Sequence, residues 1–484
     1  MRILLRQLGR CGQGAAAALL VAACAAVGPD YRAPVVALPA SYAEADGQPA
    51  GTDAAIERAW WQAFGDATLD GLVATALQDS WDLRLAMARV EEADAVLAQA
   101  HAALRPEVAA GASASRARLS EIAAFPVPAS VAAAHSDFQG QLSSSFELDF
   151  WGRLRRADEA ARAAALATRY GRATVELDLV AALVNQYLVL RSLDAQIGVS
   201  VASQANREDS ARIARERFRA GLAPELELRQ AEGAVAALQA QIADLQQQRA
   251  VALHQLALLT GKPGLALEAG DLAALPVPPM PPAGLPSDLL AARPDILQAE
   301  ATLIAANARI GVARAALFPS VTLTGTLGSE SEAFARLLSA PATLWSLVPR
   351  VDLPIFDSGR RQAVVDQGTA QQKQALAAYQ QAIQAGFAEV ADALSGVRHR
   401  AEQETALASQ RAAAERSLQL AKQRYQAGYS PFLEVLDAQR TVNDATLSFL
   451  RNRADRLVTA VQLFKALGGG WNARTAQGAP AAGG

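Results

Sequence analysis

The chain has 484 residues, with 45 Lys and Arg against 48 Asp and Glu, and a formal net charge of −3. Near-neutral charge excludes the strongly basic surface typical of a nucleic-acid-binding protein, so no nucleic acid is expected as a partner. Only 19% of the residues are charged, too few for a chain kept disordered by charge repulsion. Hydrophobic residues reach 51% but aromatic ones only 5%. Alanine makes up much of the hydrophobic fraction, and this composition favours long, closely packed helices.

The first 23 residues are predicted to be an export signal. Arg2, Arg6 and Arg10 precede an apolar stretch that is shorter than the ~20 residues of a membrane-spanning helix. Small residues then lead to Cys24, which resembles a bacterial lipoprotein signal, in which the cysteine is lipidated and becomes the first mature residue. The alternative is ordinary cleavage before Cys24, which leaves a free thiol.

The mature chain then has a single cysteine and no internal disulfide, and the only group we expect it to carry is the lipid on Cys24. One acyl chain holds a protein at a membrane only moderately. No later stretch offers about 18 uncharged apolar residues, the length of a spanning helix. A second membrane element is therefore predicted to be β-structure.

Two series of elements follow along the chain. After an extended, proline-rich segment over 24–65, the first series spans 66–260, and a proline-rich linker covers 261–293. The second series spans 294–467, and a tail covers 468–484. Within the first series we predict a helix over 82–104, a β-hairpin over 106–150 and a helical hairpin over 154–260. Within the second series we predict the same three elements, over 295–317, 317–356 and 358–467. A helix of ~65 residues is roughly 100 Å long.

The second series is an internal duplication of the first. Asp82 corresponds to Asp295 and Pro106 to Pro319, both at an offset of 213 residues. Around the breaks in the helical hairpins, Gly221 corresponds to Gly428 at an offset of 207. Several matches in the same order indicate one supersecondary unit used twice.

Four segments alternate between apolar and polar residues and are predicted to be strands, over 106–118, 136–150, 317–330 and 343–356. One apolar and one polar face over about 10 residues is typical of a transmembrane β-barrel strand, although a half-buried soluble sheet shows the same alternation. Four strands cannot close a barrel, and open edges are not tolerated in lipid. Three protomers would together supply twelve strands. The side chains of a barrel fill its interior only up to ~8 strands, so a twelve-stranded barrel leaves room for a conduit.

A set of motifs in fixed order then identifies a resemblance to the TolC-like outer membrane efflux channels, in the lipoprotein branch of tripartite efflux pumps. These motifs occupy residues 28–31 (Gly-Pro-Asp-Tyr), 60–66, 285–290, 293–295, 306–311, 428–440 and 467–471. One departure is Ala292, where the family pattern has a second basic residue before Arg293.

The resemblance implies a mixed fold, in which a membrane β-barrel joins a long α-helical barrel. It implies a homotrimer with a twelve-stranded barrel in outer membrane lipid and a helical barrel in the periplasm, and passive export of drugs and other small molecules. The partners would be a periplasmic adaptor protein and an inner-membrane transporter of RND type. The adaptor would dock at two helix-breaking tips: Gly221, Leu222, Ala223 and Pro224, and Gly428, Tyr429, Ser430 and Pro431.

The same resemblance implies a gate just after the second tip. Leu433, Glu434 and Asp437 lie within about one helical turn, and three copies would place six carboxylates around a narrow lumen that favours cations. Arg424 or Tyr425 would link the tips to a neighbouring helix. The alternative is that Glu434 and Asp437 are solvated or paired with Arg440.

Other functions are less well supported by the residues. The four histidines are scattered and form no metal-ligand or nucleophile–base motif, so an enzyme is not expected. A non-transporting envelope lipoprotein would not need duplicated strand pairs. A conduit for type I protein secretion has the same fold with different cargo, and the residues leave it open.

Overall fold

The computed structural model describes residues 26–36, 38–39, 41–44, 56–120, 122, 134–282, 287 and 289–471. These residues form two compact units. The first takes its residues from Met1–Val35, Val90–Thr168 and Ala299–Tyr379, and the second from Val36–Arg89, Arg169–Gln298 and Gln380–Gly484. The repeats of the sequence and the compact units of the structure are therefore different divisions of the chain.

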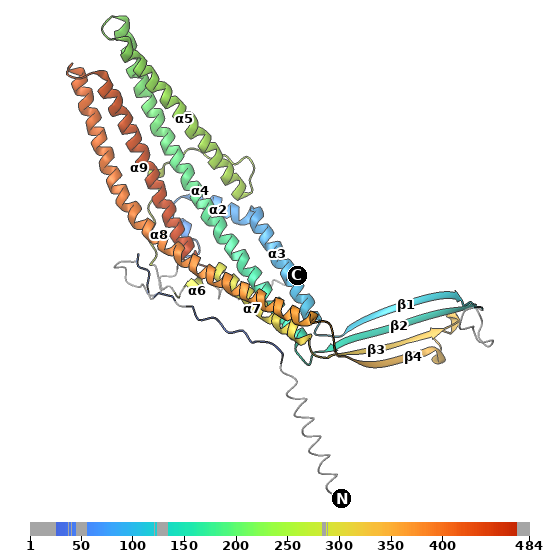
Figure 1. Cartoon of the computed structure of the whole chain (residues 1–484). Helices are drawn as coiled ribbons and strands as arrows, with labels where there is room; N and C mark the ends of the chain where they lie inside the picture. The colour runs from blue at the N-terminus through green and yellow to red at the C-terminus, as the bar shows by residue number, and fades with distance from the viewer. Residues whose placement is uncertain are drawn as a thin grey trace. The chain divides into compact units, whose positions relative to one another are not determined.

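The first unit contains an antiparallel sheet in the order β1–β2–β3–β4 (Figure 1). The strands are β1 (Glu107–Arg118), β2 (Ala134–Leu148), β3 (Ser320–Ser331) and β4 (Thr343–Asp352). The prediction of four strands is confirmed, but β3 begins at Ser320 rather than at residue 317, and β4 ends at Asp352 rather than at residue 356. Pro319 and Pro354 explain both differences, because proline has no N–H to donate to a strand ladder.

The strand register separates an apolar face from a polar one. Leu142 pairs with Leu327, which pairs with Trp345 on the next strand, and paired side chains project from the same face. All three are exposed in the single chain, at 50%, 57% and 75%. The opposite face carries serines, threonines and glutamines, among them Thr326 and Ser346, whose hydroxyl oxygens lie 2.6 Å apart. The predicted alternation is confirmed.

Eight helices complete the described part of the chain, with 3₁₀ turns between them. Their bounds are α2 (Ala67–Asp79), α3 (Trp81–Ala102), α4 (Arg153–Arg219), α5 (Glu225–Thr260), α6 (Leu289–Ala292), α7 (Pro294–Ala315), α8 (Arg360–Gln426) and α9 (Phe432–Ala466). Figure 1 shows α4 with α5, and α8 with α9, as two helical hairpins. The 3₁₀ helix η1 (Trp60–Phe64), which is capped by Gly65 with a φ of 63°, lies in the segment that was predicted to be extended.

The start of α2 lies where the sequence predicts it. The Asp66 carboxylate accepts hydrogen bonds from the backbone N–H groups of Thr68, at 2.8 Å, and Leu69, at 3.2 Å. An aspartate in this position satisfies N–H groups that have no partner within the helix.

The internal duplication is also present in three dimensions. Helices α4 and α8 each have 67 residues and begin at an offset of 207. A Cβ on Gly261 would lie 2.6 Å from the carbonyl oxygen of Asp79, and one on Gly468 would lie 2.4 Å from that of Ala292. Asp79 and Ala292, the last residues of α2 and α6, differ by the offset of 213. The same close contact therefore recurs at the offsets that the sequence predicts.

The second unit is built around a core that α4 shares with α2, α5 and α9. Leu183, Val184 and Leu188 of α4 are fully buried there. In length and composition this helix has a stretch apolar enough to cross a membrane, although every 18-residue window of it includes a charged residue, as the sequence predicts. Packing of these residues in the core accounts for that composition.

Candidate functional site

The two predicted tips have nearly identical backbone geometry. In the first, Leu222 N–H donates to the carbonyl of Arg217 at 2.8 Å; in the second, Tyr429 N–H donates to Arg424 at 2.9 Å. Gly221 and Gly428 have φ values of 73° and 79°, a left-handed conformation that favours glycine. Pro224 and Pro431 occupy the N-cap positions of α5 and α9. The side chains of Leu222 and Tyr429 are 71% and 82% exposed.

A hydrogen-bonded tie joins the two tips within the second unit. The Tyr425 hydroxyl at the end of α8 donates to the Glu227 carboxylate of α5 at 3.0 Å and accepts a hydrogen bond from Arg217 of α4. Burial, and then the contact with Glu227, raise the pKa of Tyr425, so this hydroxyl keeps its proton. Tyr425 also packs on Phe432, in a small core with Val435 and Leu436.

Tyr425 was predicted to link the tips, but neither of its partners was predicted from the sequence. Glu227 and Arg217 are the first-repeat equivalents of Glu434 and Arg424, so the duplication was the available signal. In the first repeat, Phe218 stands where the second has Tyr425. Only the second repeat therefore supplies a hydroxyl for such a tie.

The residues predicted for the gate are exposed in the single chain. Leu433 is 52% exposed, and the Glu434 carboxylate lies 3.8 Å from Arg424. Asp437 lies 2.8 Å from Arg440, which is the pairing expected by the alternative interpretation. A ring of carboxylates requires neighbouring copies, so the constriction at Leu433, Glu434 and Asp437 stays a prediction.

Cys24 lies outside the described residues, but the segment after it is held firmly to the first unit. A Cβ on Gly28 would lie 2.5 Å from the backbone of Gly311 in α7, and Gly28 has a φ of 116°. Asn307 donates to the carbonyl of Pro29 at 2.8 Å, and Arg156 binds Asp30 at 2.6 Å. Two of the family motifs thus contact each other directly.

This N-terminal segment leads to the end of strand β2. Val27 N–H donates to the carbonyl of Trp151 at 2.9 Å. Trp151 stacks on Phe318 with ring centroids 4.6 Å apart and donates to the Pro319 carbonyl at 2.8 Å. Aromatic side chains concentrate where a membrane protein meets the lipid headgroups. The N-terminal segment is therefore fixed beside Trp151 and Phe318, an aromatic pair suited to the headgroup region.

A buried ionic cluster holds the linker in the second unit. The Asp194 carboxylate, 1% exposed, lies 3.1 Å from Arg191 and 2.6 Å from Arg249 and accepts the N–H of Gly270 at 3.0 Å. The two arginines also donate to the carbonyls of Glu268 and Leu267. One carboxylate on α4 thereby orders linker residues 267–270.

The second repeat holds the same linker in a related way. Glu404 of α8 lies 2.5 Å from Arg456 and 3.3 Å from Arg453, both on α9. Arg453 also donates to the carbonyl of Leu275 at 2.9 Å. Both helical hairpins therefore bind the linker through arginine–carboxylate pairs.

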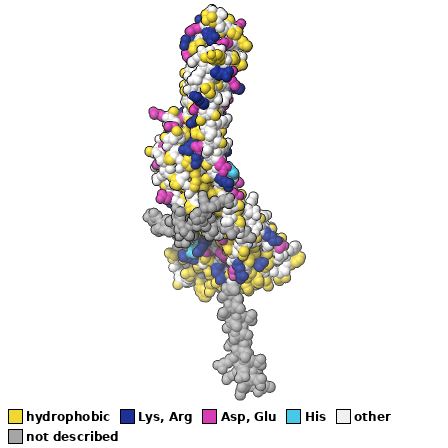
Figure 2. All heavy atoms as spheres, turned by 90° about the vertical axis from the view of Figure 1, so that its left-hand side faces the viewer, with side chains coloured by type: hydrophobic (Ala, Val, Ile, Leu, Met, Phe, Trp, Pro, Cys, Tyr) yellow, Lys and Arg dark blue, Asp and Glu magenta, His cyan; other side chains and the backbone are white. Residues whose placement is uncertain are grey.

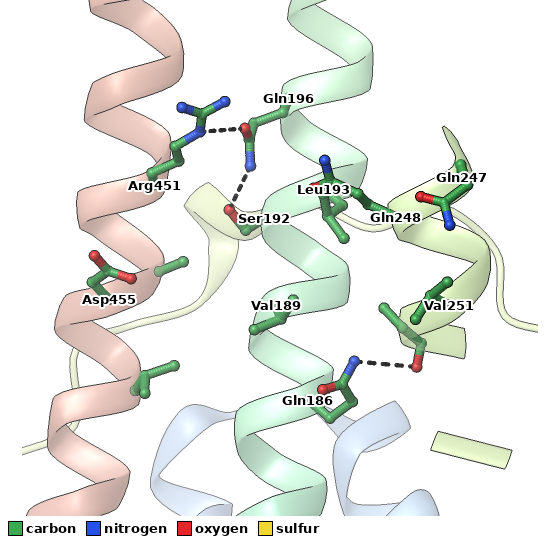
Figure 3. A pocket seen from close by; sticks show the side chains of 13 residues that line it. Gln186, Val189, Ser192, Leu193, Gln196, Gln247, Gln248, Val251, Arg451 and Asp455 are labelled. Atoms are coloured by element: carbon green, nitrogen blue, oxygen red, sulfur yellow. Dashed lines mark hydrogen bonds between the residues drawn. The ribbon is translucent and has the colours of Figure 1, made fainter. Parts of the chain in front are cut away.

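A cavity of about 630 Å³ lies between α4, α5 and α9 in the second unit (Figure 3). Arg451 donates to Gln196 at 2.9 Å, and Gln196 donates to Ser192 at 3.0 Å. Leu193 and Ala252, which also line the cavity, are buried. The lining combines glutamines and aliphatic side chains with Arg451 and Asp455, and Gln186 donates to the backbone carbonyl of Ala252 at 3.4 Å.

Charge is mixed over the face shown in Figure 2, where Lys and Arg lie among Asp and Glu from the tips downward. Among the described residues, no group of three or more His, Cys, Asp or Glu side chains is placed to hold a metal ion. The candidate functional features of the described residues are therefore the sheet, the tips and the N-terminal segment.

Among the described residues, the sheet has one apolar face and no further strand at either edge, and the chain runs from it into long helical hairpins. This is the architecture of an outer-membrane channel subunit. The family model described as outer membrane efflux protein matches residues 72–262 and 285–469. The chain belongs to this family of transport conduits.

Relatives of known name agree with this assignment. The chain is 37% identical over 423 residues to the pyoverdine export outer membrane protein OpmQ of Pseudomonas aeruginosa, covering 87% of this chain and 89% of that protein. It is 33% identical over 456 residues to the cation efflux system protein CusC of Escherichia coli, covering 94% and 97%. Its structure matches the outer-membrane channel OprN with a TM-score of 0.85 and 31% identity, covering 92% and 99%. The chain is thus an outer membrane component of an efflux pump.

Proposed function

We propose that three copies of the chain form a passive exit duct across the periplasm and the outer membrane. The observation that carries this proposal is the open sheet, whose described residues leave β1 and β4 each paired on one side only. Unpaired strand edges are costly in lipid. Joining β4 of one copy to β1 of the next gives a closed twelve-stranded barrel with its apolar face toward lipid.

The proposed partners follow from the exposed tips. A periplasmic adaptor binds at Leu222 and Tyr429 and their neighbours, and an inner-membrane transporter of RND type supplies the energy. Export of small molecules is favoured over type I protein secretion because OpmQ and CusC are named for pyoverdine export and cation efflux. A spacer without transport is disfavoured, because it needs no sheet with a lipid-compatible face.

We also propose that Cys24 is lipidated and anchors the mature chain in the outer membrane. The hydrogen bond of Val27 to Trp151 supports this proposal. Val27 is three residues after Cys24, and the bond fixes it beside the stacked rings of Trp151 and Phe318. The sheet supplies the second membrane attachment that a single acyl chain requires.

The expected mass of the membrane-extracted protein lacks residues 1–23 and includes added acyl groups. Intact-mass spectrometry measures both quantities. Cys24→Ser should remove the acyl mass while the sheet still inserts, since the strands bury their own apolar face. A wild-type chain that begins elsewhere, or has no acyl mass, contradicts the proposal.

Single-channel recording in a lipid bilayer tests the duct and its gate together. The wild-type trimer should conduct and favour cations, because Glu434 and Asp437 of three copies face a narrow lumen. Glu434→Ala combined with Asp437→Ala should lower cation selectivity and change the conductance of the closed state.

The matched control is Asp209→Ala combined with Glu216→Ala, which removes two exposed carboxylates that pair with Arg212 on α4. It should leave selectivity unchanged. If both double variants have the selectivity and conductance of the wild type, the constriction lies elsewhere. If the wild-type trimer does not conduct, the duct itself is refuted.

A further inference from the structure

The apolar face of the sheet ends in two arginines at the hairpin end of β1. Ala110 pairs with Leu142 at the centre of this face, and positions at intervals of two along a strand share a face. The last two such positions in β1 are Arg116 and Arg118, and both residues are exposed. Arg116 has no ion-pair partner among the described residues. Positive charge directly above an apolar face is suited to anionic lipid headgroups.

The acidic residues at this end of the strands lie on the opposite face. Asp137 pairs with Ser115, and Glu330 pairs with Gln139. Both acidic residues are an odd number of positions from the leucines of the apolar face on their own strands, so their carboxylates project from the polar face. Charge is therefore segregated at the hairpin end of the sheet, with arginines on the apolar side and carboxylates on the other.

The depth of the arginines follows from the length of the apolar face. Phe138 lies on that face of β2 and contacts Phe334 edge-on, with ring centroids 5.7 Å apart, and such aromatic pairs are typical of a membrane interface. From Phe138 to Leu148 the strand is about 34 Å long. At a tilt of about 40° this is roughly 26 Å across a membrane, which agrees with the apolar band of an outer-membrane barrel. Arg116 pairs with Ser136, two residues beyond Phe138, and is therefore at the level of the lipid headgroups.

The helices identify this end of the sheet as the outer one. Glu107 pairs with Ser145 and Ser320 pairs with Asp352, so all four strands join α3, α4, α7 and α8 at the opposite end. In the proposed duct the long helices lie in the periplasm. The hairpin end then reaches the outer leaflet, whose main lipid is lipopolysaccharide, a glycolipid with phosphate groups on its sugar headgroup.

We propose that Arg116 and Arg118 bind the phosphate groups of lipopolysaccharide in the outer leaflet. Residues two positions apart on one face of a strand are separated by about 7 Å, so both arginines can reach one headgroup. Guanidinium groups donate paired hydrogen bonds to phosphate oxygens, and the acyl chains of the same lipid lie against Phe138 and the alanines of β1. This proposal rests on the proposed duct and adds the lipid that contacts its outer end.

Native mass spectrometry of the full-length trimer in detergent tests the proposal, with two lipids as probes: lipid A that carries two phosphates, and phosphatidylglycerol. The wild-type trimer should bind lipid A more tightly than phosphatidylglycerol, because two phosphates match two guanidinium groups. Arg116→Ser combined with Arg118→Ser should weaken the binding of lipid A at least about tenfold, because each arginine near an anionic headgroup adds to the attraction. Each single variant should lose part of the affinity, and the trimer seen in the same spectra shows that the variant is folded.

The matched control is Arg350→Ser, which removes an exposed arginine from the polar face of β4, where Arg350 forms an ion pair of 2.8 Å with Asp352. It should leave the binding of lipid A unchanged. If the double variant of Arg116 and Arg118 binds lipid A as tightly as Arg350→Ser does, or if the wild type binds phosphatidylglycerol as tightly as lipid A, the lipopolysaccharide site is wrong while the duct stands. A wild-type chain that forms no trimer in these spectra refutes the proposed duct instead.

Discussion

Asp194→Ala is expected to lower the free energy of unfolding of the helical region by about 3–5 kcal/mol, the usual cost of removing one partner from a buried ion pair. The carboxylate is 1% exposed and serves Arg191, Arg249 and the N–H of Gly270. Its loss leaves two guanidinium groups facing each other without a counter-charge. Denaturant unfolding followed by circular dichroism measures the change.

The same variant should loosen the linker, since Asp194 orders residues 267–270. Hydrogen exchange in the native protein should therefore rise in that segment before it rises in α4. Asp209→Ala is the control, because Asp209 is an exposed partner of Arg212 on the same helix and exposed pairs contribute little. Equal unfolding free energies for the two variants would show that the Asp194 cluster does not stabilise the fold.

Leu142→Arg is expected to destabilise the barrel by about 2–4 kcal/mol, the cost of an arginine at mid-bilayer on a lipid-facing strand. Leu142 sits at the centre of the apolar face, between Ala110 and Leu327 on the neighbouring strands. Reversible urea unfolding in lipid vesicles measures this cost.

Ser143→Arg is the matched control, one residue further along β2 and on the opposite face. If that face lines the lumen, the arginine meets water, and the cost should be small. A larger penalty for Ser143→Arg than for Leu142→Arg would reverse the assignment of the two faces. Equal penalties would indicate a sheet that does not separate lipid from water.

The two repeats share a backbone but have diverged at the side chains that make tertiary contacts. Phe218 and Tyr425 are equivalent, yet only Tyr425 donates to a carboxylate. Leu258 and Lys465 are equivalent, yet only Lys465 has a charged partner in the chain. Equivalent positions of the two repeats therefore differ in the contacts that they make within the chain.

The sequence by itself determined the fold class, the duplication, the four strands, the long helices and the positions of the two tips. These features depend on local signals: alternation with a period of two, helical periodicity and glycine or proline at the breaks. The strand ends were less accurate, because the prolines at residues 319 and 354 limit the ladders.

Only the tertiary structure decided which side chains meet. Tyr425 and Glu227 are separated by 198 residues and Asn307 and Pro29 by 278, and no local pattern specifies such pairs. The clusters around Asp194 and Glu404 were missed for the same reason: a buried carboxylate looks like an exposed one in a sequence until packing removes its water and supplies arginines. Local periodicity sets the backbone of each repeat, whereas the contacts that distinguish the repeats arise only when distant segments pack together.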